Sequence, residues 1–273
     1  MKNNKILTIR KENSILYCIF VVIVFFIAFK GSGWFISLIT NDADNYGSLF
    51  VKEAIGVLIA IFLVWYSGVS KIFDRKGTGI RKGLFIGAYN VVIATLTLII
   101  NLFLEDVEHN LQPWYLILAF LLCMVCVGIT EELVFRGVIA EILFHKFGTN
   151  KVGIWKAVLL SGVFFGAIHL SNIIYAPSIG VIVQVIGAGI SGMLFTAIYY
   201  RSGNIWVTVI IHTYIDMAAL ILSGFFGNGT IQSTISDYKF SKLIGCIPYI
   251  LVLLFLLRNK KIEEIKKNMA YES

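Results

Sequence analysis

The sequence predicts an all-α fold, a polytopic membrane bundle of about eight transmembrane helices, and two observations carry this prediction. First, 58% of the 273 residues are hydrophobic and only 14% are charged, whereas a soluble domain has about 45–50% apolar and about 25% charged residues. Second, residues 83–104 and 157–200 contain no Asp, Glu, Lys or Arg. Because a helix needs about 20 apolar residues to cross a bilayer, the longer run holds two spans, broken near 171–177.

The apolar runs of the chain are separated by short polar segments, and each run is predicted to be one span. The fourth run is longer than a bilayer requires, so this helix is expected to tilt or to protrude. In residue numbers the eight predicted spans are 14–36, 54–70, 83–104, 114–142, 157–174, 178–200, 204–224 and 243–257.

The basic residues alternate along these segments in the way that the positive-inside rule describes. If the N-terminus is cytoplasmic, the inner segments hold eighteen of the 23 Lys and Arg residues and the outer segments hold four, while Arg136 lies within a span. This asymmetry predicts an even number of spans with both termini cytoplasmic. The net charge of +7 therefore belongs to short loops at the membrane, and no nucleic-acid partner is expected.

Among the ionisable side chains inside the predicted spans, six are candidates for a functional site. The stretch GITEELVFRG, residues 128–137, holds three of them within one apolar run. A charge at the centre of a bilayer costs several kcal/mol, so such residues normally face a protein interior or a water-filled cavity and mark function. The six residues are Glu131, Glu132, Arg136, His169, His212 and Asp216.

Helical spacing divides these residues by role. Glu132 and Arg136 are four positions apart, so they share a helix face and can form an ion pair. Glu131 is about 100° further round the helix, which leaves its carboxylate free for chemistry. The same four-residue spacing separates two other pairs, Phe165 from His169 and His212 from Asp216.

Two kinds of hydrolytic site can be built from these side chains. In one, a carboxylate such as Glu131 takes a proton from water, one histidine orients that water, and the other histidine stabilises an oxyanion. In the other, Glu131, His169 and His212 bind Zn²⁺, with a water molecule in the open coordination position. Both routes end in attack of water on a carbonyl group, and the residues alone leave both open.

Other readings of the same residues carry no catalysis. An intramembrane histidine often makes an interhelical hydrogen bond, a Glu–Arg pair is often structural, and a proton or ion pathway also uses such groups. Against a transporter, the sequence shows no inverted repeat and no matched pair of broken helices. Polar sites on three predicted helices favour one shared cavity.

Three motifs give the sequence a family resemblance. EExxxR at Glu131–Arg136, FxxxH at Phe165–His169 and HxxxD at His212–Asp216 occur in this order. Together they resemble the CAAX protease and bacteriocin-processing (CPBP, or Abi) family of intramembrane proteases. The segment GMLFTAIYYRSGNIWVTVIIH, which ends at His212, is also similar to that family, and each motif alone is weak evidence.

The resemblance divides the chain into three parts. It covers residues 114–225, which are expected to form a CPBP/Abi-like catalytic core. Residues 1–113 hold the first three spans and no recognisable motif. Residues 226–273 hold the last span and a basic cytoplasmic tail, for which the charge pattern predicts a frayed helix at the membrane surface.

The resemblance also implies an eight-helix bundle with a cavity toward the cytoplasm, and roles for the motif residues in peptide-bond hydrolysis. Glu131 would be the base, and His169 would lie beside the attacking water. His212 and Asp216 would stabilise the oxyanion. The first two motifs would be supported by Glu132, Arg136 and Phe165.

One residue departs from the family pattern. The third motif often ends in Asn, whereas this chain has Asp216. An amide can donate a hydrogen bond to an oxyanion, but an ionised carboxylate can only accept one. Asp216 must therefore be protonated, orient His212 or bind a metal. The presence of Asp instead of Asn slightly favours a metalloprotease with Zn²⁺.

The predicted function is an intramembrane endopeptidase acting on a peptide or membrane-protein substrate in the lipid bilayer. The richness in Lys, Ile and Asn is typical of a bacterial multi-pass protein of the cell membrane. Bacterial members of the family are associated with peptide maturation and bacteriocin self-immunity, so a prenylated substrate is not expected. The alternative is a non-catalytic membrane partner or immunity protein that acts by binding, and such a protein should tolerate Glu131→Gln.

Overall fold

The computed structural model is built from α-helices with short 3₁₀ and π segments, and it describes residues 12–40, 45–105, 110–148, 150–174, 176–229 and 231–269. No strand occurs within these ranges. Five helical segments are long and apolar enough to cross a membrane, or up to seven if each of two bent pairs is one span. The chain is thus a multi-pass membrane protein. The five are 14–39 (α2), 46–66 (α3), 114–147 (α6, η2 and α7), 151–174 (α8 and η3) and 178–202 (α9).

The remaining predicted spans are bent or short. The third is a pair of helices, α4 (Ile80–Ile86) and α5 (Ala88–Phe103), bent by 75°, and the eighth is a pair bent by 60° around residues 257–258. The seventh, α10 (Ile205–Ala219), has only 15 residues. The predicted count of eight is therefore not confirmed, although every predicted span overlaps an apolar helix.

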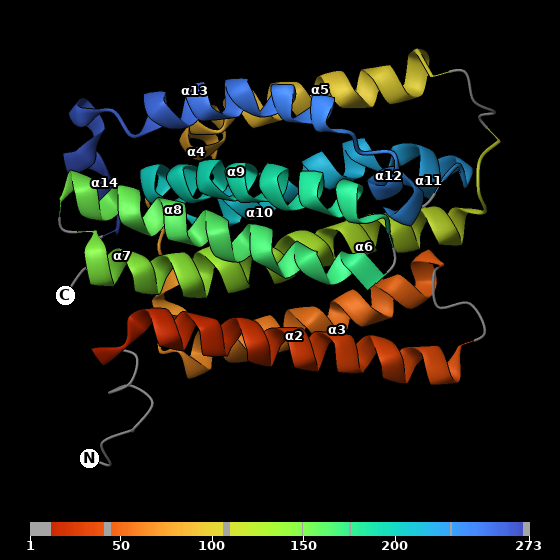
Figure 1. Cartoon of the computed structure of the whole chain (residues 1–273), viewed down its shortest axis with the longest axis horizontal. Coiled ribbons are helices and arrows are strands. Elements are labelled where there is room, and N and C mark those ends of the chain that lie inside the picture. The colour runs from red at the N-terminus through yellow and green to blue at the C-terminus, as the bar shows by residue number, and fades with distance from the viewer. Residues whose placement is uncertain are drawn as a thin grey trace.

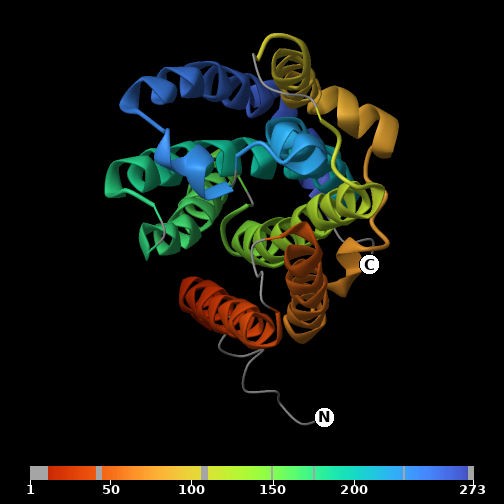
Figure 2. The ribbon, with the colours of Figure 1, turned by 90° about the vertical axis from the view of Figure 1, so that its right-hand side faces the viewer.

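The bundle is arranged in layers (Figures 1 and 2). Helices α2 (Ser14–Ile39) and α3 (Tyr46–Tyr66) form one side, and α5 lies with α13 (Cys246–Leu256) on the opposite side. Between them lie the three segments that carry the predicted motifs, together with α9. In chain order these are α6 (Trp114–Glu132) with α7 (Glu141–Phe147), α8 (Lys151–Ile168), α9 (Ser178–Ser202) and α10.

Glycines allow α8 and α9 to pack closely. The stretches GVFFG, residues 162–166, and GAGISG, residues 187–192, have the small-residue spacing that lets membrane helices approach each other. A methyl group on Gly162 would lie 2.6 Å from the carbonyl oxygen of Gly189, and one on Gly166 would lie 3.1 Å from the Cα atom of Gly189. Any larger side chain would therefore push the two helices apart. This close approach sets the distance between Phe165 of α8 and Phe195 of α9, which flank the site described below.

The C-terminal segment is not a frayed helix, and that prediction was wrong. Helix α14 (Ile262–Met269) buries Ile262, Ile265 and Met269. Its Asn268 side chain donates to the backbone oxygen of Arg201 at 2.6 Å, at the end of α9. The charged residues of the tail hid this apolar stripe, whose 3–4-residue spacing is that of a helix face packed on a core.

The turn between α9 and α10 is shaped to receive α14. Gly203 ends α9 with φ of 63°, a left-handed conformation that favours glycine, and a methyl group there would lie 2.6 Å from the Asn268 backbone oxygen. The side chain of Asn204 then caps α10 by accepting from the backbone N–H of Trp206 at 2.9 Å. Figure 1 places α14 and the start of α2 at the same end of the bundle. That this end is cytoplasmic remains a prediction from the charges.

The docking of α14 can be tested by truncating one buried side chain. Ile265 is fully buried, so Ile265→Ala should lower the free energy of unfolding by about 2–5 kcal/mol. Lys267→Ala, on the exposed face of the same helix, is the matched control and should change it by less than about 0.5 kcal/mol. Thermal unfolding in detergent micelles measures both. Equal stability of the two variants would show that α14 is not docked.

Candidate active site

The first motif lies where α6 passes into a π-helical segment, η2 (Leu133–Ala140). Glu131 and Glu132 belong to the last turn of α6, and Arg136 lies in η2. Every residue of η2 is buried. π-helical turns are rare in proteins, and many of those that occur lie at functional sites. Here the wider turn places Arg136 in the interior of the bundle.

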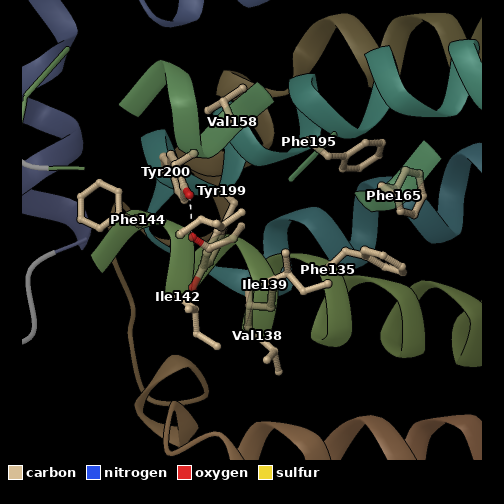
Figure 3. Close-up of a cluster of buried hydrophobic side chains, with 14 of the residues drawn as sticks. Phe135, Val138, Ile139, Ile142, Phe144, Val158, Phe165, Phe195, Tyr199 and Tyr200 are labelled. Atoms are coloured by element: carbon tan, nitrogen blue, oxygen red, sulfur yellow. Dashed lines mark hydrogen bonds between the residues drawn. The ribbon is translucent and has the colours of Figure 1, made fainter. Parts of the chain in front are cut away.

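Arg136 is fully buried, and its guanidinium group is held on two sides. Its Nη1 lies 3.0 Å from Glu132 Oε1, which confirms the predicted ion pair. The guanidinium carbon lies 4.3 Å from the centre of the Phe165 ring and 5.1 Å from that of Phe195, within the range of cation–π attraction. Figure 3 shows Phe165, Phe195 and Phe135 gathered in one part of the buried cluster.

Glu132 has a second partner, which the sequence did not predict. Its Oε1 lies 2.7 Å from His212 Nδ1, across 80 residues of chain. An ionised carboxylate can only accept hydrogen bonds, so Nδ1 of His212 must carry a hydrogen in this contact. Glu132 therefore fixes both the orientation of the imidazole ring and the nitrogen that faces away from the pair.

The other nitrogen of His212 faces two carboxylates. His212 Nε2 lies 3.6 Å from Glu131 Oε2 and 3.5 Å from Asp216 Oδ2. The side chains of Glu131 and Asp216 are 27% and 24% exposed, whereas that of Glu132 is fully buried. Two neighbouring glutamates thus have different surroundings, as the 100° offset predicts: one is enclosed and paired, the other is accessible.

His169 is the predicted site residue that stands apart. It is the first residue of η3 (His169–Ile174), and its Nδ1 lies 2.8 Å from the backbone oxygen of Phe165. Its ring centre is 5.2 Å from that of Phe165, and the Phe165 ring is in turn 6.0 Å from that of His212. Within the described residues, no hydrogen bond or ion pair joins His169 to Glu131 or His212. Phe165 is the neighbour that the two histidines share.

The residues predicted as zinc ligands do not form a metal-binding group in this arrangement. Among the described residues, no three His, Cys, Asp or Glu side chains are grouped so that they could hold a metal ion. His212 Nδ1 is taken by Glu132, and His169 directs its Nδ1 to its own helix. Tetrahedral zinc needs its donor atoms about 2.0–2.3 Å from one point. The mechanism proposed below therefore uses no metal.

Glu53 of α3 is an acid near the site that the sequence analysis missed. Glu53 is buried, and its Oε1 lies 3.7 Å from Lys52 Nζ. Its carboxyl group also interacts with the charges of Glu131 and Asp216. The predicted second span, 54–70, begins one residue after Glu53, so the sequence places this acid in a loop. Helix α3 in fact begins at Tyr46, where Asn45 caps it by accepting from Ser48 N at 2.9 Å.

A second buried ionic cluster, also missed, lies beyond η2. Glu141 is fully buried and accepts from both terminal nitrogens of Arg75, at 2.5 and 3.1 Å, and from the Tyr199 hydroxyl at 2.7 Å. The Tyr200 hydroxyl donates to the backbone oxygen of Ala140 at 2.6 Å. Tyr199 and Tyr200 lie side by side in Figure 3. These contacts fix the end of η2 that is opposite Glu132.

Comparison with known proteins agrees with the motifs. Residues 113–218 match the family model described as Type II CAAX prenyl endopeptidase Rce1-like. The match includes all three motifs and confirms the family resemblance predicted from them. Residues 113–218 are therefore similar to CAAX-type endopeptidases, which are proteases. No curated protein and no solved structure is significantly similar to the chain.

The buried ion pair can be tested by removing its cationic member. Arg136→Gln would leave the Glu132 carboxylate buried with one partner fewer, so we expect the free energy of unfolding to fall by about 3–5 kcal/mol. Adding Glu132→Gln should recover part of this loss, because the coupling of contacting residues is about 0.5–3 kcal/mol. Unfolding of the single and double variants measures it, and strictly additive losses would show that the pair is not coupled.

The hydrogen bond that holds the end of η2 can be tested separately. Tyr200→Phe would leave the buried Ala140 oxygen without its donor and should cost about 1–3 kcal/mol of stability. Tyr249→Phe is the control, since within the described residues no hydrogen bond to the Tyr249 hydroxyl is found. The comparison uses the unfolding temperature of each variant. If the Tyr200→Phe variant is as stable as the control, the hydrogen bond from Tyr200 to Ala140 does not stabilise the end of η2.

Proposed function

We propose that this chain is an intramembrane endopeptidase in which Glu131 activates a water molecule that hydrolyses a peptide bond of a membrane-associated or small peptide substrate. One observation carries the proposal: Glu131 and Asp216 face one nitrogen of His212, while buried Glu132 holds the other. An accessible carboxylate is thus placed beside an imidazole whose orientation is fixed. The family match supports the same reaction class.

The proposed reaction begins with proton transfer from water to the Glu131 carboxylate. The water oxygen forms a bond to the carbonyl carbon, and the carbonyl oxygen becomes an oxyanion. His212 Nε2, protonated, donates to this oxyanion, while Nδ1–H remains bonded to Glu132. Separations of 3.5 and 3.6 Å from Nε2 to the two carboxylates exceed a good hydrogen bond, so Nε2 can donate to a reacting oxygen between them.

The second step breaks the carbon–nitrogen bond. The oxyanion collapses to a carboxylic acid, and the leaving amine takes from Glu131 the proton that came from water. Glu131 is then ready for another turnover. The overall reaction consumes one water molecule and one peptide bond, and Glu131 acts first as base and then as acid.

Asp216 and His169 have supporting roles in this proposal. Asp216, where the family often has Asn, lies beside His212 Nε2 and orients the imidazole. His169 donates from Nδ1 to the Phe165 oxygen, which leaves its Nε2 lone pair to accept from the attacking water. Aromatic contacts of Phe165 with both histidines support this placement.

The proposed biological setting follows the predicted family. Maturation of a small peptide, or self-immunity against a bacteriocin, in a bacterial cell membrane would each use an endopeptidase of this kind. A protein that works only by binding is the competing proposal. It needs the fold and the buried pair but not the accessible carboxylate.

The deciding experiment compares purified wild-type protein, Glu131→Gln and His169→Ala against a library of unmodified and prenylated peptides. Wild-type cleavage should fall at least about 10³-fold in Glu131→Gln, since the base would be lost, and about 10²-fold or more in His169→Ala. Lys82→Gln, in a polar segment away from the motifs, is the control and should retain wild-type activity. A chelator should leave cleavage unchanged. Loss of cleavage in the chelator, restored by Zn²⁺, would instead establish the metal route.

Activity in Glu131→Gln equal to that of the wild type would refute the assigned base. The same variants in cells test the binding-only alternative. If Glu131→Gln and His169→Ala keep the cellular phenotype while being expressed at wild-type levels, the protein works without hydrolysis.

A further inference from the structure

A polar pocket of about 620 Å³ lies about one helical turn beyond Asp216 of the candidate active site. It is formed where the end of α5 meets the junction of α10 with α11 (Ile221–Phe226) and the segment 237–242. This is the end of the bundle opposite α14 (Figure 1). None of the three motifs lines this pocket.

The pocket reaches to within one helical turn of Asp216. Its lining includes Ala219 and Leu220, and the backbone N–H of Leu220 donates to the Asp216 backbone oxygen at 3.0 Å. Tyr238, another lining residue, interacts with the Asp216 charge: burial, and then the nearby Asp216 carboxylate, raise the pKa of the Tyr238 phenol. A molecule in the pocket would therefore lie about one helical turn from Asp216, whose carboxylate faces His212.

Hydrogen bonds between helices build the walls of the pocket. Asn101 of α5 donates from Nδ2 to the backbone oxygen of Ala218 at 2.8 Å, which ties α5 to the end of α10. The Tyr46 hydroxyl of α3 donates to Ser223 Oγ at 2.9 Å, and Ser223 donates to the Gly229 oxygen at 3.0 Å. Both Asn101 and Ser223 line the pocket, so its shape is set by contacts that join separate parts of the chain.

The lining is charged in a way that suits a peptide rather than an acyl chain. It includes the acids Glu105 and Asp237 and the bases Lys239 and Lys242. Within the described part of the chain, no ion pair joins any two of these four residues. Lys242 Nζ lies 3.4 Å from the centre of the Tyr238 ring, which holds its ammonium group at the pocket wall.

We propose that this pocket is a subsite for the polar residues of the peptide substrate beside the scissile bond, and that Lys239 and Lys242 bind an acidic group there. This inference rests on the proposed function, because it places the peptide next to Asp216. The two acids of the lining would take main-chain N–H groups or a basic residue. The peptide would then reach the catalytic residues from the end of the bundle opposite α14. If the α14 end is cytoplasmic, as the charges predict, this is the outer end, so the subsite departs from the cytoplasmic cavity that the family resemblance implies.

The test measures peptide binding without cleavage, in the Glu131→Gln protein. Fluorescent peptides carry a single Asp or a single Lys at successive positions, and their affinities are compared with and without the added pair Lys239→Glu and Lys242→Glu. At one or two positions the Asp peptides should bind at least about tenfold more weakly to the charge-reversed protein, about 1.4 kcal/mol, and the Lys peptides should bind more tightly. The control, Arg81→Glu with Lys82→Glu at the other end of the bundle, should leave both affinities unchanged.

Unchanged affinities in the charge-reversed protein, or an equal loss for Asp and Lys peptides, would overturn the subsite. Cleavage of the same peptides by the wild type is scored separately. Charge-dependent binding without wild-type cleavage would refute the endopeptidase and keep the pocket. Wild-type cleavage together with charge-independent binding would support the endopeptidase and refute the pocket as a subsite.

Discussion

The buried carboxylate of Glu132 is the constraint on which the rest of the site depends. A charge without solvent is stable only with partners, and Glu132 has two, Arg136 and His212. These three residues lie on α6, η2 and α10, so one carboxylate joins the first and third motifs. The same contacts leave Glu131 on the accessible side and turn Nε2 of His212 toward it. Structural and chemical roles are thus divided between adjacent glutamates.

The positions of the aromatic rings around Arg136 depend on a different feature, the glycines at the contact between α8 and α9. Phe165 and Phe195 flank the guanidinium group because α8 and α9 approach at Gly162, Gly166 and Gly189. Helix packing without side chains between the backbones is common in membrane proteins. This packing also has an electrostatic effect. The guanidinium group of Arg136 is buried away from solvent, and the faces of the two aromatic rings stabilise its charge instead.

Contacts between residues that are close in the sequence could be predicted, whereas contacts between residues far apart in the sequence could not. The Glu132–Arg136 pair is local, so helical periodicity was sufficient. The contact between Glu132 and His212 spans 80 residues, and no periodic pattern encodes it. Glu53 was missed because the boundary of a span was placed too late, and α14 because charged neighbours masked three apolar residues. The motif spacing therefore named the site residues, whereas their partners needed the packed structure.

The π-helical segment has a consequence for how this chain can evolve. Glu132 and Glu141 stand at its two ends, one tied to Arg136 and His212, the other to Arg75 and Tyr199. Each residue of an α-helix advances the direction of the side chains by about 100°, and each residue of a wider π-helical turn advances it by somewhat less. If one residue between Glu132 and Glu141 were deleted, only one of the two glutamates could keep its partners, because the other would be rotated away from its own. Loops elsewhere can change length, but this segment is held to one length by the two buried charges that it separates.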